Sequence, residues 1–515
     1  MDTPMTTAPN LPEHWAQVQP DRPAVVAADQ TLSWRELNTL ADNIANQLAR
    51  RGIGAGDIVA LRMQTTSQWV TLMLALSKLK ARLLGINWRL VADEVNYVLE
   101  NAGARMLILD DEPPQAFMDK ISALPRDAII PVNRTGAGSQ WNALIRPAGA
   151  PLAMDELCEQ IIYTSGTTGR PKGVERHLRP EPGNERLNRY LEAQGGAYKR
   201  YQACDVVLVS MPLHHGSGPS QVRAAMASGS MLVLQNRFDA AHWFDLAEQH
   251  GVTHWTGVPT MYKRLKSYQE ASGRQVPRLK SMGIGAAPVP MAIKRWVHEQ
   301  FGPVLHEGYG STETGMVAGM KPDDHFRKPG SSGLPYDGVE VEIRDEDGKP
   351  CPCGTVGEIW VDTPAVIKSY LNAPPLDEDT LDARGFFRTG DMGHLDADGY
   401  LYITDRAKDM IISGGVNIYP AEIEAAFYQH PGLLDIAVVG LPDEEFGEKV
   451  VAYYESRDGQ PIAGDELAAL GQAHLASYKR PRDFVHVAEL PRNAVGKILK
   501  RELRQPHWKT QERNV

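Results

Sequence analysis

Strand-like and helix-like segments alternate along much of this sequence, and the alternation restricts the possible folds more than any other feature. Within residues 31–63, Ser33 and Glu36 form a capping box at the start of an amphipathic segment, and Gly52 ends that segment before the strand-like run 58–61. Further strand-like runs, separated by helix-like segments, lie at 206–209, 231–234 and 253–257. Such alternation predicts an α/β fold with mostly parallel sheets covered on both faces. Because these sheets bind ligands at the carboxyl ends of their strands, we expect the functional motifs in the loops that follow strands.

The character of the sequence changes twice toward the C-terminus. Between residues 335 and 405, short β-prone runs are broken by Gly-, Pro- and Asp-rich turns, which predict a small antiparallel sheet or barrel. An αβ pattern then returns, with helix-like segments at 420–428 and 465–475 and strand-like runs at 436–440 and 449–454. We therefore place a domain boundary at Lys408, between an N-terminal domain of residues 1–407 and a C-terminal domain of residues 408–515.

The charge balance and the apolar stretches exclude some classes of protein. The 64 acidic residues outnumber the 54 basic ones and leave a formal charge of −10, which disfavours nucleic acid as a partner because phosphate binding needs a clustered basic surface. The N-terminus does not resemble a secretory signal, and the most apolar stretch, 69–79, is shorter than the roughly 20 residues that a bilayer requires. We expect a cytoplasmic protein without membrane insertion. Cys351 and Cys353 form a single doublet, typical of a surface turn rather than a zinc site.

The most informative motif lies in residues 161–174, where an apolar strand runs into a loop of hydroxyl residues and glycines that ends in a lysine. Glycines let backbone amides wrap an anion, hydroxyls donate further hydrogen bonds, and the lysine supplies positive charge. These properties suit a polyphosphate, although the order of residues is not that of a P-loop. The residues that we expect at the phosphates are Thr164, Ser165, Gly166, Thr167, Thr168, Gly169 and Lys172.

Two further segments carry candidate ligands for a nucleotide. The segment 308–315 follows a strand-like run, and we interpret it as a second loop. There Tyr309 offers a flat face for a purine, Thr312 a donor to phosphate and Glu313 a hard oxygen ligand for Mg²⁺. The segment 388–391 places Asp391 after a turn, where it could accept hydrogen bonds from both ribose hydroxyls. Taken alone, a structural turn or salt bridge explains this last segment equally well.

Read together, these segments resemble the adenylate-forming superfamily, which contains acyl-CoA synthetases, firefly luciferase and the adenylation domains of peptide synthetases. The resemblance covers residues 11–503. Its signatures occur in the family order: YTSGTTGRPKGV at 163–174, MPLHHG at 211–216, GYGSTE at 308–313, RTGD at 388–391, DRAKDMIISGGVNIYPAEIE at 405–424 and PRNAVGK at 491–497.

The resemblance implies a fold and a role for each matching residue. It implies a large N-terminal domain of two βα sheets plus a small β-barrel, followed by a small, mobile α+β lid. Glu313 matches the magnesium ligand, Lys408 the hinge, and Lys497 the lysine that approaches the acyl carboxylate and the α-phosphate. The nucleotide site would also include Gly285, Ala286, Ala287, Pro288, Tyr309, Gly310, Thr312, Asp391 and Arg406, and the pantetheine channel Gly414 and Gly415.

The function implied is that of an ATP-dependent acyl-CoA ligase, an acid–thiol ligase with ATP, Mg²⁺ and coenzyme A as cofactor and co-substrates. A carboxylate attacks the α-phosphate of ATP, and coenzyme A then displaces AMP after the lid rotates about its hinge. The catalytic residues would be Lys172, His215, Thr312, Glu313 and Lys497. His215 as a packed structural histidine stays an alternative. His214 stands where the family usually has Phe or Tyr, so the sequence does not establish which residue gates the acyl pocket.

The nature of the acid is only partly constrained. Apolar and small residues in the expected acyl pocket favour an uncharged, hydrophobic and bulky acid; they are 255–259, 282–286, Met316 and Val317. An acyl-AMP ligase that delivers to a carrier protein, or an enzyme of only one half-reaction, are alternatives of the same class. The alternative of a different class is a nucleotide-binding protein without catalysis. The presence of Lys172, Glu313, Asp391 and Lys497 argues against it. A homodimer is left open.

Overall fold

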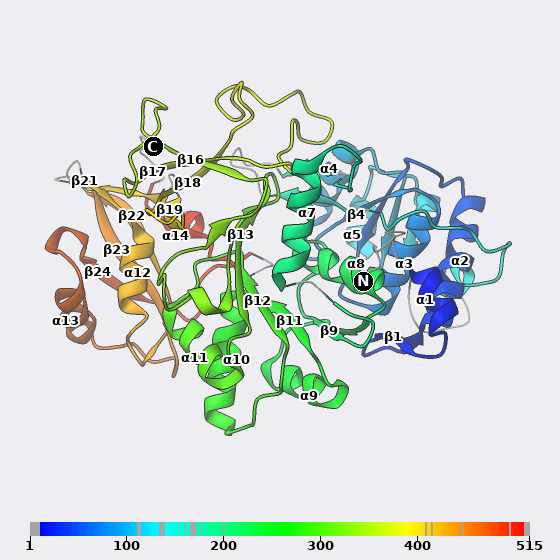
Figure 1. Cartoon of the computed structure of the whole chain (residues 1–515), viewed down its shortest axis with the longest axis horizontal. Helices are drawn as coiled ribbons and strands as arrows, with labels where there is room; N and C mark the ends of the chain where they lie inside the picture. Colours follow the sequence, from blue (N-terminus) through cyan, green and yellow to red (C-terminus); the bar gives the residue numbers. More distant parts are fainter. Residues whose placement is uncertain are drawn as a thin grey trace, which may run out of the picture.

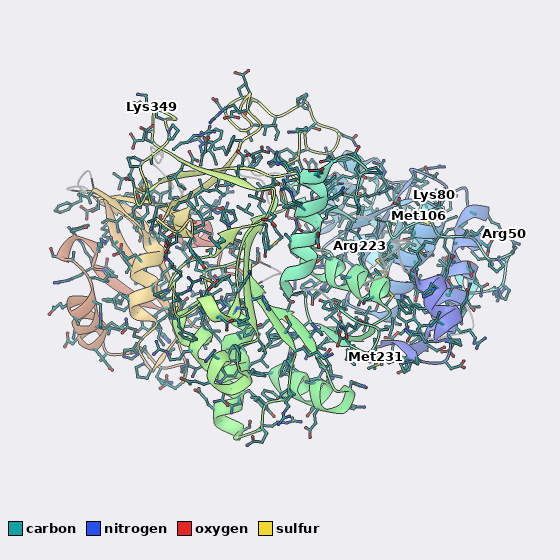
Figure 2. The ribbon with its side chains drawn as sticks, viewed as in Figure 1. Arg50, Lys80, Met106, Arg223, Met231 and Lys349 are labelled. Carbon is teal, nitrogen blue, oxygen red and sulfur yellow. The ribbon has the colours of Figure 1, made fainter. Side chains whose placement is uncertain are left out.

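The structure is a computed structural model in which two large sheets lie on either side of a layer of helices, with a smaller sheet and a C-terminal domain to one side (Figure 1). Side chains at opposite ends of the molecule are exposed, such as Arg50 and Lys80 at one end and Lys349 at the other (Figure 2). The residues described are 11–110, 115–132, 140–158, 160–164, 171–176, 178–198, 201–406, 409–413, 416–443, 446–493 and 496–508.

The first large sheet has six strands in the order β6-β5-β3-β4-β7-β8, all parallel except for the β7–β8 pair. The strands are β3 (Ile58–Arg62), β4 (Arg82–Gly85), β5 (Met106–Leu109), β6 (Ile129–Pro131), β7 (Gln160–Thr164) and β8 (Lys172–Val174). The helices of this region are α1 (Pro12–Val18), α2 (Trp34–Arg50), α3 (Ser67–Lys78), α4 (Ala92–Ala102), α5 (Gln115–Lys120) and α6 (Gln140–Leu144).

The second large sheet has nine strands in the order β15-β14-β13-β12-β11-β9-β10-β1-β2. They are β1 (Pro23–Val26), β2 (Thr31–Ser33), β9 (Val206–Val209), β10 (Met231–Leu234), β11 (His254–Gly257), β12 (Ser281–Gly285), β13 (Leu305–Ser311), β14 (Gly315–Met320) and β15 (Leu334–Pro335). Its central strands are parallel, because helices connect them. These helices are α8 (Ser217–Ser228), α9 (Ala240–His250), α10 (Pro259–Ser272) and α11 (Met291–Phe301), while α7 (Glu185–Tyr198) leads from β8 of the first sheet to β9.

The buried side chains separate into layers that explain this arrangement. One core cluster joins α2 and α3 to the facing sides of both sheets, for example through Ile44, Val59 and Val207. A second cluster packs α4 on the outer face of the six-stranded sheet, and a third packs α9, α10 and α11 on the outer face of the nine-stranded sheet. The predicted α/β fold with parallel sheets covered on both faces is therefore confirmed. The Ser33–Glu36 capping box at the start of α2 is also present.

The third sheet is antiparallel, with strands in the order β16-β17-β18-β19. They are β16 (Glu340–Arg344), β17 (Gly357–Asp362), β18 (Phe387–Leu395) and β19 (Leu401–Arg406). Of the two forms predicted for this region, the described strands adopt the antiparallel sheet, with β16 and β19 at its ends. Cys351 and Cys353 lie in the turn before β17, and the described residues contain no group of three or more His, Cys, Asp or Glu side chains that could hold a metal ion.

The C-terminal domain is built on a mixed sheet whose longest strands, β22 and β23, pair along their whole length. On the other edge of β23 lie β20 and β24. The elements are β20 (Ile411–Ser413), β21 (Val416–Ile418), α12 (Pro420–Phe427), β22 (Leu433–Asp443), β23 (Gly447–Ser456), α13 (Gly464–His474), β24 (Asp483–His486) and α14 (Lys500–Arg504). One core cluster packs α12 and α13 against the sheet, and the opposite face packs against Leu490 and α14. The small α+β domain predicted after the β-rich region is confirmed.

Residues 69–78 of the apolar segment 69–79 belong to α3, whose twelve residues are all buried between the two large sheets, and Leu79 caps the helix. Throughout the described part of the chain, every helix is too short or too polar to cross a membrane.

Candidate active site

The carboxyl ends of β7, β12 and β13 meet at one edge of the large sheets, together with the loop that follows β9. A Cβ atom placed on Gly216 would lie 3.2 Å from Cδ1 of Ile162, so the 211–216 loop rests against β7 just before Thr164. Gly285 at the end of β12 pairs with Gly308 of β13, which brings residues 285–288 beside Tyr309. Four separate sequence motifs therefore converge here, as expected for ligand binding at the carboxyl ends of strands.

The segment 308–315 is not the loop that the sequence predicted. β13 continues through Ser311, because it pairs with β12 on one side and with the antiparallel β14 on the other. Only the turn from Ser311 to Gly315 connects the two strands. A Cβ atom on Gly310 would lie 2.1 Å from the carbonyl oxygen of Gly315, so the close approach of the two strands excludes any side chain there. The turn presents Thr312 and Glu313.

One end of the site gathers Thr164, Lys172 and Glu313. Thr164 and Lys172 are directly opposite each other in the antiparallel β7–β8 pair, so their side chains leave the same face of the hairpin. The hydroxyl of Thr164 donates to Oε1 of Glu313 at 3.3 Å. A carboxylate, a hydroxyl and an ammonium group thus lie together, which is the donor set expected around a metal-bound polyphosphate. Residues 165–169, predicted to line the same phosphates, lie outside the described residues.

Tyr370 is a member of this cluster that the sequence reasoning missed. Its hydroxyl donates to Oε1 of Glu313 at 3.4 Å, and Nζ of Lys172 lies 4.6 Å from the centre of its ring. Burial, together with the carboxylate of Glu313, raises the pKa of Tyr370 to about 12, so the phenol stays a donor. The loop is anchored by backbone hydrogen bonds from Ile367 to Glu313 and from Leu371 to Gly173.

The other end of the site is formed by Tyr309, Asp391 and Arg406. The hydroxyl of Tyr309 donates to Oδ2 of Asp391 at 2.7 Å, and Nε of Arg406 contacts Oδ1 at 2.7 Å. Asp391 is buried, whereas Tyr309 and Arg406 are half-buried. Burial, and after it the charge of Asp391, raises the pKa of Tyr309 well above its usual value, which keeps the phenol protonated. The carboxylate is therefore held as a fixed acceptor.

Asp391 does not follow a turn, contrary to the sequence-based interpretation. Residues 388–391 lie within β18, where the pairing with β17 shifts between Trp360 and Glu358 and forms a bulge. Gly390 has a φ of 70°, which glycine adopts without strain. The bulge turns Asp391 toward Arg406, the residue directly opposite on β19. The salt-bridge interpretation of this segment holds, and Tyr309 binds the same carboxylate.

The residues after β12 carry a strained backbone. Ala286 has a φ of 67°, a conformation that residues other than glycine rarely adopt. Ala286 and Pro288 are exposed, whereas Ala287 is half-buried. Strained residues of this kind cluster at ligand sites, and this loop borders Tyr309.

The two neighbouring histidines are both neutral. Burial lowers the pKa of His214 to about 3 and that of His215 to about 4. Their ring centres are 4.8 Å apart. His214 is buried, and neither ring nitrogen has a hydrogen-bond partner among the described residues. His215 is half-buried on the same loop beside β7, which is compatible with a role at the site or with simple packing.

The C-terminal domain reaches this edge through the segment 490–499. A Cβ atom on Gly496 would lie 2.7 Å from Oγ1 of Thr260, in the first turn of α10. Lys497, next to it, has an exposed side chain, and its backbone closes a turn with Asn493 through two 2.9 Å hydrogen bonds. The predicted hinge Lys408 and the predicted channel glycines Gly414 and Gly415 lie outside the described residues.

Several residues expected in the acyl pocket lie in the hydrophobic core instead. Trp255 and Met282 face the outer helices of the nine-stranded sheet, and Val317 belongs to the core of the four-stranded sheet. Trp255 donates through Nε1 to Oγ of Ser210 at 3.1 Å. Their neighbours Thr256 and Gly283 contact each other on the opposite face of the sheet, toward the layer between the two sheets.

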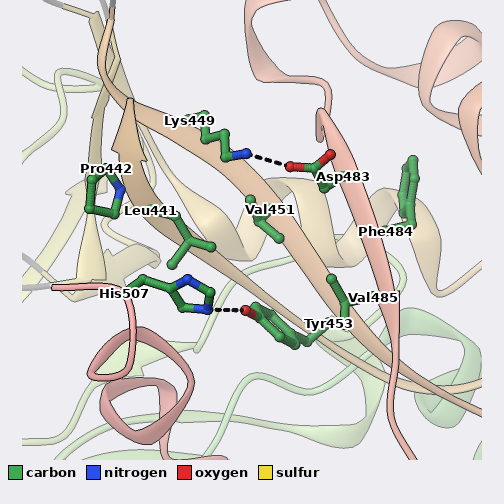
Figure 3. Close-up of a pocket in the computed structure, with 9 residues that line it drawn as sticks. All are labelled: Leu441, Pro442, Lys449, Val451, Tyr453, Asp483, Phe484, Val485 and His507. Atoms are coloured by element: carbon green, nitrogen blue, oxygen red, sulfur yellow. Dashed lines mark hydrogen bonds and ion pairs between the residues drawn. The ribbon is translucent and has the colours of Figure 1, made fainter. Parts of the chain in front are cut away.

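A separate surface hollow lies on the C-terminal domain between β22, β23, β24 and His507 (Figure 3). Its polar groups are paired with one another: Lys449 with Asp483 at 2.8 Å, and Tyr453 with His507 at 3.1 Å. None of the predicted site residues lines it. We therefore place the candidate active site at the edge of the large sheets.

The residues at the Thr164 end fit a magnesium ion. Mg²⁺ usually binds to one or two carboxylates and completes its shell with water and substrate phosphates. Glu313 supplies one such carboxylate beside two hydroxyl groups and an ammonium group. The described residues contain no group of three or more ligating side chains. The metal would therefore depend on the nucleotide for most of its ligands.

Comparison with known proteins gives a consistent result. The family model of the AMP-binding enzyme matches residues 12–371, and that of the AMP-binding enzyme C-terminal domain matches residues 422–497. Fatty acid–acyl-carrier-protein ligase ScoC of Streptomyces coeruleorubidus is 32% identical over 97% of this chain and 96% of its own length. Feruloyl-CoA synthase of an Amycolatopsis species is 33% identical over 96% of this chain and 98% of its own length. The structure of o-succinylbenzoate coenzyme A synthetase from Bacillus subtilis, in complex with ATP and a magnesium ion, has a TM-score of 0.79 and 30% identity; the match covers 96% of this chain and 99% of that one.

Proposed function

Because the chain belongs to the AMP-binding enzyme family, we propose that it is an ATP-dependent acyl-CoA ligase that forms an acyl-adenylate and transfers the acyl group to coenzyme A. The family assignment made from the sequence motifs is thereby confirmed, as is the class of AMP-forming acid–thiol ligase. One observation carries the proposal: a single edge of the fold holds Thr164, Lys172 and Glu313 at one end and the Tyr309–Asp391–Arg406 triad at the other.

The two ends of the site have different tasks. Asp391 would accept hydrogen bonds from the ribose, since a carboxylate has about four lone-pair sites and Tyr309 and Arg406 use two of them. Lys172 and Thr164 would bind the phosphates, together with residues 165–169 as predicted from the sequence. Glu313 would hold Mg²⁺, which when bound offsets the repulsion between two reacting anions.

The acid must attack the α-phosphate from a position next to both ends of the site. The carboxylate oxygen forms a bond to phosphorus, and the bond to pyrophosphate breaks. Positive charge near the new pentacoordinate centre lowers this barrier, and Lys497 is the residue that we assign to it. The thiol of coenzyme A then attacks the acyl carbon, and AMP leaves with the bonding electrons.

We assign the two steps to two positions of the C-terminal domain. The segment that carries Lys497 docks on α10 through Gly496, which fits the adenylating position. Rotation about a hinge at Lys408 would replace this segment with Gly414 and Gly415. The boundary between residues 1–407 and 408–515 stays a proposal. A homodimer and a cytoplasmic location also stay proposals from the sequence.

A hydrophobic, bulky acid is the substrate that we favour. The relatives named for feruloyl and o-succinylbenzoate groups support an acid with a ring. The similarity to an acyl-carrier-protein ligase keeps transfer to a carrier protein as the alternative second step. Both possibilities share the first half-reaction.

Separate assays of the half-reactions test the proposal. ATP–pyrophosphate exchange is measured with a panel of aryl, fatty and polycyclic acids, and thioester formation is measured from supplied acyl-AMP with either coenzyme A or a carrier protein. We expect exchange to depend on both the acid and Mg²⁺, and the thioester to form with coenzyme A. Transfer only to the carrier protein would favour the alternative. Nucleotide binding without exchange for any acid would identify a protein that has lost catalysis.

A further inference from the structure

One face of α10 forms the docking surface for the C-terminal domain. Thr260, Lys263 and Ser267 lie at positions i, i+3 and i+7, which place their side chains on the same side of the helix. Thr260 lies against Gly496, Lys263 pairs with Asp435, and Oγ of Ser267 accepts from Arg457 at 2.6 Å. A shallow crevice lined by Ser267, Glu270, Ala271, Leu434 and Arg457 continues this contact at its outer end.

Lys263 takes part in a buried ionic network that crosses the domain boundary. Its Nζ lies 2.7 Å from Oδ1 of Asp435, and Nη2 of Arg492 lies 2.8 Å from Oδ2 of the same carboxylate. Tyr428 also donates to Asp435, and Arg492 binds Glu455 at 2.9 Å. The side chains of Lys263 and Asp435 are 10% and 3% exposed, so solvent screens their attraction little.

The positive charges of Lys263 and Arg492 favour the ionised form of Asp435. Burial alone would raise the pKa of Asp435, but Lys263 and Arg492 together bring it below its usual value. Burial lowers the pKa of Lys263, and the carboxylate of Asp435 opposes that shift. The ring of Tyr428 covers the ammonium group at 4.1 Å and adds a cation–π contact.

Arg492 connects this network to the segment that carries Lys497. While its Nη2 binds Asp435, its Nη1 donates to the carbonyl oxygen of Gly496 at 3.3 Å. Gly496 precedes Lys497 and contacts α10 one turn before Lys263. The position of Lys497 relative to the N-terminal domain is thus fixed at two points of one helix.

We propose that Lys263 is a positioning residue for acyl-adenylate formation, which through Asp435 and Arg492 holds the Lys497 segment against α10. The inference rests on the proposed two-step function. Breaking a buried ion pair is costly when it leaves an unpaired buried charge. Here, separation of the domains returns Lys263 to solvent. Asp435 then still has two partners in its own domain, Arg492 and Tyr428. The contact can therefore open for the second step.

The test compares Lys263→Met with Lys263→Arg and with Lys266→Met. Lys266 is a matched control, because it is on the same helix and pairs with Glu270 of that helix. Each variant is assayed for ATP–pyrophosphate exchange and for thioester formation from supplied acyl-AMP. We expect Lys263→Met to lower kcat of exchange by about 10- to 100-fold, the scale of a misplaced catalytic group, with KM for ATP within about twofold. Thioester formation should stay at the parent rate or rise.

Lys263→Arg should recover most of the exchange rate, because it keeps a charge for Asp435, and Lys266→Met should match the parent. Exchange by Lys263→Met at the parent rate would overturn the proposal, as would equal losses in both half-reactions of a variant with the parent melting temperature. If Lys263→Met has a lower melting temperature than the parent, Lys263→Gln is tested instead, and its rate of exchange is compared with its rate of thioester formation. The parent enzyme is assayed first, so absence of both half-reactions there would refute the proposed function rather than the role of Lys263.

Discussion

The hydroxyl of Tyr309 donates to Oδ2 of Asp391 across 2.7 Å and so joins β13 of the nine-stranded sheet to β18 of the four-stranded sheet. Arg406, opposite Asp391 on β19, binds the other carboxylate oxygen at the same distance. The carboxylate is therefore oriented before any ligand arrives. Pre-orientation of this kind lowers the entropy that must be lost on binding.

Replacing Tyr309 by Phe tests this orientation. The variant loses one hydrogen bond to a charged group, worth about 1.5–3 kcal/mol, but keeps the ring that we expect to face the purine. The free enzyme loses this hydrogen bond as well, so only part of that free energy is lost from ATP binding. We therefore expect KM for ATP in pyrophosphate exchange to rise by roughly 3- to 30-fold while kcat changes little. A matched control is Tyr402→Phe, on β19 of the same sheet and outside the triad. An unchanged KM would show that Asp391 is held without the phenol.

Replacing Glu313 by Gln should affect the rate more than binding of the adenosine. The amide oxygen can still accept from Thr164 and Tyr370, so the local structure should persist while the negative charge is lost. We expect exchange to fall by about 10²–10³-fold and the Mg²⁺ concentration for half-maximal rate to rise. The exposed Glu340 on β16, changed to Gln, is the control. If magnesium dependence stayed that of the parent, Glu313 would not be the metal ligand.

Lys497→Ala separates the two half-reactions. One charged group acting on the transition state supplies about 10²–10³-fold in rate, and we expect exchange to fall by at least that factor. Thioester formation from supplied acyl-AMP should be largely preserved, because we assign this lysine to the first step only. Lys349→Ala, at an exposed turn between β16 and β17, serves as the control. An equal loss in both assays would contradict the assignment.

The sequence predicted best what depends on local periodicity. The capping box of α2, the alternation of strands and helices and the αβ pattern after residue 408 all recur in the structure. It predicted poorly what depends on partners distant in the chain. β13 extends beyond its local signal because β12 and β14 pair with it, and the bulge at Gly390 forms only against β17.

The same reason explains the residues that were misplaced or missed. In a strand buried on both faces, periodicity does not show which face meets a ligand, and Trp255 and Met282 turned out to face the outer helices. Tyr370 lies in an irregular loop whose place is set by contacts with Glu313 and Lys172. Lys263 and Asp435 are 172 residues apart, so no local pattern links them.

His214 should make the protein sensitive to acid. Its pKa falls from 6.5 to about 3 on burial, so protonation favours the unfolded chain. The stabilisation is complete above pH 6.5 and is lost as the pH falls toward 3, with about 2 kcal/mol lost at pH 5. We expect His214→Phe to reduce the difference in unfolding free energy between pH 7.5 and pH 5 by about that amount, measured by denaturant unfolding. If this difference in unfolding free energy is the same in the variant as in the parent, His214 is protonated in the folded protein without loss of stability.

The contact between Gly496 and Thr260 allows the two-position mechanism to be tested by a covalent cross-link. A Cβ atom on Gly496 would lie 3.9 Å from Cβ of Thr260, within the roughly 3.5–4.5 Å that disulfides span. The Thr260→Cys, Gly496→Cys variant should therefore form a disulfide on oxidation. The φ of 81° at residue 496 costs a non-glycine residue roughly 1–2 kcal/mol, which the cross-link can bear.

Once oxidised, the double variant should hold the Lys497 segment on α10. We expect pyrophosphate exchange to continue at about the rate of the reduced enzyme. Ligation of coenzyme A should fall by at least about tenfold, because the proposed domain rotation that admits the thiol would be blocked. A reductant should restore ligation. The single variants control for oxidation of the exposed Cys204 and Cys353 and should not respond to the oxidant. Since mass spectrometry can verify the cross-link, ligation at the parent rate by the fully oxidised enzyme would mean that both half-reactions proceed with the C-terminal domain in one position.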